Sequence, residues 1–181
     1  MQAAALMLLV PAQARVGETR AECEQRYGKG SDLELKVGAI LREAAANWTA
    51  TVYSSHGLTI EIVFENDRAV FVRYTNQPVL SFGEHDRTVP GLTHREINYL
   101  KRANAGSDTE WRRFKEPILE EYAPTLTVWK TSDGKYFSGY DREGRRFFVC
   151  DSDFWEDVIV PIRESAAAAD RSDSAARLEG L

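Results

Sequence analysis

The sequence predicts an α+β fold made of two tandem repeats, each a short helix followed by an antiparallel meander, with the helices packed on one face of the sheets. The same helix-start signal occurs at Thr19–Glu22 and at Thr93–Glu96, 74 residues apart. Each is followed by strand-like alternation broken by polar turns. With 181 residues, 43% of them hydrophobic, the chain can form one ordinary domain or two small ones. We expect repeat 1 at residues 15–90 and repeat 2 at residues 91–162.

Residues 1–14, MQAAALMLLVPAQA, form an uncharged apolar run that ends in the small-x-small pattern Ala12-Gln13-Ala14. This pattern predicts a signal peptide cut before Arg15, and hence an exported protein, periplasmic or secreted. A positively charged start is missing from the run, and a buried N-terminal helix is the alternative interpretation. About ten apolar residues are too few to span a membrane, so we expect no integral membrane segment after cleavage.

Two capped helices open the repeats. In each one, the threonine hydroxyl and the glutamate carboxylate satisfy backbone N–H groups at the helix start, and Gly28 or Gly106 can end the helix. The second helix carries a buried stripe of Ile97 and Leu100, joined by the alkyl stem of Lys101.

About three strands follow each helix, because apolar and polar residues alternate between turn signals. In the first half we expect strands at residues 49–53, 58–64 and 70–74, and in the second half at residues 126–130, 136–140 and 146–150.

Three further segments are harder to assign. Residues 36–47 carry good helix formers, although a strand continuing into Trp48 is an alternative. Residues 107–121 place Trp111, Phe114 and Ile118 at helical spacing. Residues 163–181 contain almost no bulky apolar side chains, which predicts a frayed helix or a disordered tail.

The two cysteines, Cys23 and Cys150, are a disulfide candidate because an exported protein folds in an oxidising compartment. The alternative is that both are small buried side chains, since free cysteine is among the most buried residue types.

Composition argues against several classes of function. The net charge is −5 and no segment is dense in Lys and Arg, so we expect no nucleic-acid partner. Neither Glu84-His85-Asp86 nor the run 150–153 matches a known zinc or calcium spacing, and there is no phosphate-binding glycine loop. We therefore expect no metal and no cofactor.

Four strings carry a resemblance: GETRAECEQRYGKG, YSSHGLTIEIVFENDRAVFVRYTN, LTHREINYLKRANAG and WKTSDGKYFSGY. Over roughly residues 15–155 the chain resembles a group of uncharacterised exported bacterial proteins. More distantly, it is similar to the tandem-repeat β-lactamase inhibitory protein and to small outer-membrane assembly lipoproteins. The inhibitor resemblance implies a concave, aromatic face that grips a partner protein. This chain departs from both, with one cysteine per half and no acylated cysteine.

Aromatic side chains in the second meander indicate where such binding could occur. Adjacent residues of a strand point to opposite faces, so some rings lie off the helix-covered face. The candidate binding residues are Trp129, Tyr136, Phe137 and Tyr140, unless a loop or the other sheet covers them.

These observations favour a non-catalytic exported protein, a binding or inhibitory module that recognises a protein or envelope partner through a sheet face. One alternative is a small hydrolase that uses His56 or the Glu84–Asp86 region, although no catalytic motif surrounds either. The other is a purely structural envelope protein. The sequence leaves the partner and the oligomeric state open.

Overall fold

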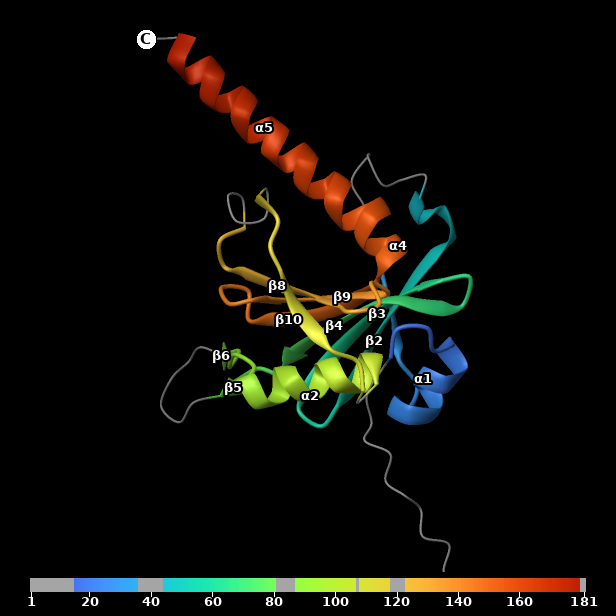
Figure 1. Cartoon of the computed structure of the whole chain (residues 1–181). Helices are drawn as coiled ribbons and strands as arrows, with labels where there is room; N and C mark the ends of the chain where they lie inside the picture. Colours follow the sequence, from blue (N-terminus) through green and yellow to red (C-terminus); the bar gives the residue numbers. More distant parts are fainter. Residues whose placement is uncertain (1–14, 36–43, 81–86, 107, 118–122, 180–181) are drawn as a thin grey trace, which may run out of the picture.

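In the computed structural model, eight strands form one antiparallel sheet in the order β1-β2-β3-β4-β10-β9-β8-β7 (Figure 1). The structure describes residues 15–35, 44–80, 87–106, 108–117 and 123–179, so the predicted signal peptide and the Glu84-His85-Asp86 cluster lie outside the described residues. The strands of this sheet are β1 (Ser31–Leu33), β2 (Trp48–Ser55), β3 (Leu58–Glu65), β4 (Arg68–Asn76), β7 (Trp111–Phe114), β8 (Leu126–Thr131), β9 (Tyr136–Asp141) and β10 (Arg146–Asp151). A separate two-stranded sheet pairs β5 (Val79–Leu80) with β6 (Arg87–Thr88).

The predicted strands form with small shifts at their ends, because apolar and polar residues alternate along them and successive side chains of a strand point to opposite faces of the sheet. In β3, for example, Ile60, Ile62 and Phe64 are buried on one face. The two meanders join where β4 pairs with β10, which sets Phe71 opposite Cys150 and Arg73 opposite Phe148. This pairing makes one sheet from the two halves of the chain.

The predicted fold, two tandem repeats with helices on one face, is wrong. One eight-stranded sheet spans both halves, and helices cover both of its faces (Figure 1). Helices α1 (Arg20–Tyr27) and α2 (His94–Ala105) cover what we call the α2 face. The segment α4 (Ser152–Phe154), η3 (Trp155–Ile159) and α5 (Val160–Glu179) begins against what we call the α5 face. The two halves of the chain also continue differently after their last strand. Strand β10 is followed by α4, η3 and α5, whereas the described residues after β4 form the β5–β6 pair.

The physical reason is that a sheet with apolar side chains on both faces needs cover on both faces. Two clusters of buried residues result, one on each side of the sheet. The cluster on the α2 face consists of Val16, Cys23, Tyr53, Ile60, Ile62, Phe64, Ala69, Val72, Tyr74, Leu92, Ile97, Leu100, Phe147 and Val149. The cluster on the α5 face consists of Val70, Val128, Phe137, Cys150, Phe154, Trp155 and Val158.

The C-terminal segment is helical and begins against the α5 face of the sheet. Its start is fixed by the Asp151 carboxylate, which accepts a hydrogen bond from the Phe154 N–H at 2.8 Å. The π-helical stretch η3 then places Trp155 and Val158 in the core. Residues 163–179, expected to be a frayed helix or part of a disordered tail, continue as α5, and Ala167 is fully buried. The alanines of this segment are too small to form an apolar core of their own, but alanine has the highest helix propensity of all residues.

The segment expected to be helical at residues 107–121 contains strand β7 instead. In β7, Trp111 packs on the α2 face, whereas Phe114 packs on the α5 face against Phe137 and Trp155. Residues three apart in a strand point to opposite faces of the sheet. Trp111 and Phe114 can therefore each pack in one of the two clusters without forming a helix. In the other segment, predicted as a helix or a strand at residues 36–47, residues 36–43 lie outside the described residues, and residues 44–47 form a short 3₁₀ turn before β2.

Both predicted capping boxes are confirmed, and so are the glycines that end α1 and α2. At α2, the Thr93 N–H donates to the Glu96 carboxylate at 2.6 Å, and the Thr93 hydroxyl accepts from the Glu96 N–H at 3.3 Å. Ile97, Leu100 and Lys101 are all buried, as the stripe predicted.

The α2 cap supplies the first testable prediction. Replacing Thr93 with alanine removes the hydroxyl acceptor and leaves the Glu96 N–H to water, so we expect a loss of about 0.5–2 kcal/mol in the free energy of unfolding. Urea denaturation measures this change. Thr93→Ser keeps the hydroxyl and is the matched control. An equal loss in both variants would contradict the capping role.

Candidate functional site

The four predicted binding residues do not share one face of the sheet. Phe137 is only 1% exposed and stacks on Trp155, with ring centroids 4.5 Å apart and planes 3° apart. Trp129, Tyr136 and Tyr140 are half-buried and pack against the core of the α2 face. These four rings therefore form no common exposed surface.

Trp129 has a cationic neighbour. The Lys101 ammonium lies 3.9 Å from the centroid of the Trp129 ring and 5.5 Å from that of the Trp111 ring. Lys101 itself is 7% exposed. Burial lowers the pKa of Lys101 from 10.5 to about 8, while the indole faces favour the ammonium and oppose part of this effect.

This lysine predicts a pH dependence of stability. Between pH 8 and pH 10.5 the unfolded chain keeps the Lys101 proton that the folded chain releases, so stability contributed by this residue rises with pH. Lys101→Met retains an apolar stem and has no charge. We expect the free energy of unfolding of the wild type, measured relative to Lys101→Met, to increase from pH 7.5 to pH 10. Parallel pH profiles would contradict this assignment.

The disulfide candidate is not formed. Cys23 and Cys150 are both free and buried, and they belong to the clusters on opposite faces of the sheet. Burial raises the pKa of Cys23 to about 12 and that of Cys150 well above its ordinary value. The alternative interpretation, two small buried side chains, describes both residues.

One side-chain contact bears on the alternative hypothesis of a small hydrolase that uses His56. The Ser55 hydroxyl and the His56 Nδ1 are 2.7 Å apart in an exposed turn, where His56 has a φ of 50°. Within the described residues no other side chain hydrogen-bonds to the His56 ring, and no group of three His, Cys, Asp or Glu side chains is placed to hold a metal ion. Among those residues, no helix has both the length and the apolar character needed to cross a membrane.

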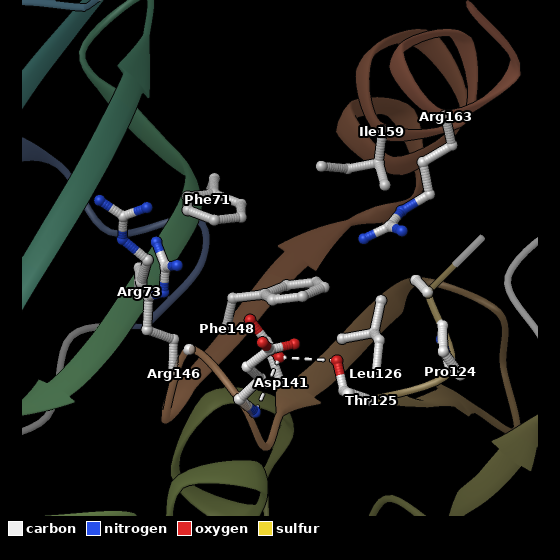
Figure 2. A pocket seen from close by; sticks show the side chains of 13 residues that line it. Phe71, Arg73, Pro124, Thr125, Leu126, Asp141, Arg146, Phe148, Ile159 and Arg163 are labelled. Atoms are coloured by element: carbon white, nitrogen blue, oxygen red, sulfur yellow. Dashed lines mark hydrogen bonds between the residues drawn. The ribbon is translucent and has the colours of Figure 1, made fainter. Parts of the chain in front are cut away.

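A concave site lies on the α5 face, between the sheet and the first turns of α5 (Figure 2). This α5-face cavity has a volume of about 680 Å³, a size typical of small-ligand sites. Strands β4, β8, β9 and β10 line it, together with the turn between β9 and β10, the residues before β8 and the start of the C-terminal helix. The lining residues are Phe71, Arg73, Ala123, Pro124, Thr125, Leu126, Asp141, Glu143, Gly144, Arg146, Phe148, Ile159 and Arg163.

The floor of the cavity is aromatic. Phe71 and Phe148 stack with centroids 5.6 Å apart and planes 23° apart, each half-buried. Gly139, on the neighbouring strand β9, makes this possible. A Cβ atom there would lie 2.4 Å from two atoms of the Phe148 ring. The ring can therefore lie over β9 only because residue 139 has no side chain.

Three arginines surround this floor. Figure 2 shows Arg73 and Arg146 beside each other at one end, and Arg163 extending from α5 at the other end. Arg73 forms an ion pair with Glu61, its cross-strand partner. No described residue forms an ion pair within 4.0 Å with Arg146 or Arg163.

Of the two carboxylates in the lining, Asp141 is engaged by its own turn. It accepts hydrogen bonds from the Thr125 hydroxyl at 3.0 Å and from the Glu143 N–H at 3.1 Å. Partial burial opposes ionisation of Asp141, but hydrogen bonds from Gly144, Thr125 and Glu143, with the charge of Arg146, hold its pKa below the ordinary value. Asp141 is therefore ionised at neutral pH and shapes the β9–β10 turn.

Sequence reasoning missed this cavity, although part of its signal was visible. Phe71 and Arg73 are two residues apart in one strand, and so are Arg146 and Phe148, so each pair shares a face. Bringing the two pairs together requires the β4–β10 pairing, which local patterns do not predict, and the helix after β10, which local spacing indicates only in part.

No family model, no curated protein and no solved structure matches this chain. The geometry of the α5-face cavity is therefore the basis for the functional proposal.

Proposed function

We propose that this protein is a non-catalytic binding module that holds its ligand in the α5-face cavity. The observation that carries the proposal is the combination of an open cavity of about 680 Å³, a stacked aromatic floor and three arginines at its ends. Apolar walls with a few placed polar groups are typical of ligand sites. Binding through a sheet face was the expectation from the sequence, and the proposal keeps that part of it.

Export and an envelope partner also belong to this proposal. They are supported by the signal-like residues 1–14. The inhibitory role, by contrast, depended on a tandem-repeat architecture. Because the sheet is continuous and its two faces are covered by different helices, that role is no longer proposed.

The experiment asks whether anything occupies the cavity. The chain starting at Arg15 is incubated with a solvent extract of bacterial envelopes, re-purified and examined by native mass spectrometry. We expect a bound component in the wild type, together with slower hydrogen exchange of backbone amides in the β9–β10 turn.

A blocking variant makes the result specific. Ala123→Trp places an indole at the cavity wall and is expected to abolish the bound component. Ala21→Trp, an exposed position on α1, is the matched control and should retain it. Equal retention in both variants, or no bound component in the wild type, would overturn the proposed function.

A further inference from the structure

We propose that the ligand of the α5-face cavity is an amphiphilic anion, with a carboxylate or phosphate group joined to an apolar chain. This inference rests on the proposed binding function and adds the chemical class of the ligand. It follows from the distribution of apolar and charged groups along the cavity.

The apolar part of the ligand is matched by the floor and one wall. Phe71 and Phe148 present stacked ring faces, and Leu126 and Ile159 add aliphatic contacts. All four are only half-buried in the structure, so they retain apolar surface that a ligand can remove from water. Burial of such surface drives binding.

The anionic part is matched by the arginines. Three guanidinium groups line the cavity against two carboxylates, and one of these carboxylates, Asp141, is already hydrogen-bonded within its turn. Arg73 is partly neutralised by Glu61. Arg146 and Arg163 have no carboxylate of a described residue within 4.0 Å, although the charge of Arg146 also acts on Asp141. Their guanidinium groups can therefore bind an added carboxylate or phosphate with paired hydrogen bonds.

Arg163 is the residue on which the inference depends most. It is half-buried, and Figure 2 shows its side chain reaching from α5 toward Leu126 and Phe148. Burial lowers its pKa, although the carboxylates of Asp141 and Glu116 partly offset this effect. Arginine stays protonated in spite of such shifts. A desolvated cation without an ion-pair partner among the described residues gains most when an anion enters.

The test is isothermal titration calorimetry with octanoate and octyl phosphate. Octan-1-ol supplies the chain without the charge, and acetate and inorganic phosphate supply the charge without the chain. We expect at least one octyl anion to bind the wild type at least about tenfold more tightly than octan-1-ol or the matching short anion. The octyl anion that binds more tightly identifies which head group the site prefers, and preference for either one supports the inference.

Variants locate the binding. Arg163→Gln and Arg146→Gln remove one charge each, and each is expected to weaken binding of the octyl anion by about 10- to 100-fold. Arg95→Gln, at an exposed position on α2, is the matched control and should leave affinity unchanged. Thermal unfolding of each variant checks that the fold is kept.

Several results would overturn the inference. Octan-1-ol binding as tightly as octanoate would remove the anionic requirement, and inorganic phosphate binding as tightly as octyl phosphate would remove the apolar one. Unchanged affinity in Arg163→Gln would place the ligand elsewhere. Failure of both octyl anions, while the envelope extract still yields a component lost in Ala123→Trp, overturns this inference and leaves the proposed function standing. A peptide mass in that component would identify a protein partner instead.

Discussion

Replacing Trp155 with alanine is expected to lower the free energy of unfolding by about 3–5 kcal/mol. Trp155 is 2% exposed and is the largest of the fully buried side chains. Its ring stacks on Phe137 and meets Phe114 edge-on, with centroids 6.2 Å apart. Alanine would leave a cavity between η3 and the sheet, at the point where the C-terminal helix is attached.

Urea denaturation monitored by circular dichroism measures this loss. Trp48→Ala is the matched control, because Trp48 also belongs to the α5 face and packs on Phe154 at 5.3 Å but is only half-buried. The control should lose clearly less stability than Trp155→Ala. A loss below about 1 kcal/mol in Trp155→Ala would contradict the packing of η3 on the sheet.

The same substitution connects stability with binding. Arg163 is carried by α5, eight residues after Trp155, and η3 is the segment that fixes α5 to the sheet. Loosening η3 therefore moves one of the three arginines away from the cavity. We expect Trp155→Ala to bind the octyl anions more weakly even under conditions in which the chain is still folded.

Local signals in the sequence predicted local structure well. The boxes at Thr19 and Thr93 specify helix starts because the groups that pair are three residues apart. The turns between β2 and β3 and between β9 and β10 likewise lie where polar residues interrupt alternation. These features depend on neighbouring residues, so a pattern within ten residues is sufficient.

The features that the sequence did not predict depend on strand pairing and packing between distant parts of the chain. The repeat hypothesis treated the two meanders as separate units with one helix layer. Apolar residues on both sides of β10, such as Phe147 and Phe148, instead require two layers of cover. The helix that supplies the second layer was visible in part, because Trp155, Val158 and Ile159 lie at i, i+3 and i+4.

The candidate site also depends on contacts between residues that are far apart in the sequence. Trp129, Tyr136, Phe137 and Tyr140 were selected because aromatic residues are common in binding surfaces, yet burial of Phe137 is fixed by Trp155, eighteen residues further along the chain. The cavity arginines come from β4, β10 and α5. Only the assembled sheet places them around one floor.

Gly139→Ala is expected to lower the free energy of unfolding by about 1–3 kcal/mol, the range for overpacking a filled site. The new Cβ would lie 2.4 Å from the Phe148 ring and 3.1 Å from a Leu126 methyl group. Moving the ring away from residue 139 would disturb its contacts with Phe71 and Trp155, at centroid distances of 5.6 Å and 6.4 Å. Displacement of the ring would also disturb the cavity floor, so affinity for the octyl anions should fall.

A double-mutant cycle with Phe148→Ala tests this cause. Without the ring, the Gly139→Ala change has little left to overlap, and alanine stabilises a strand relative to glycine by roughly 0.5–1 kcal/mol. We therefore expect Gly139→Ala to be neutral or stabilising in the Phe148→Ala background, with a coupling free energy of at least about 1 kcal/mol. Equal destabilisation in both backgrounds would mean that the Phe148 ring does not require glycine at position 139, and that another constraint selects it.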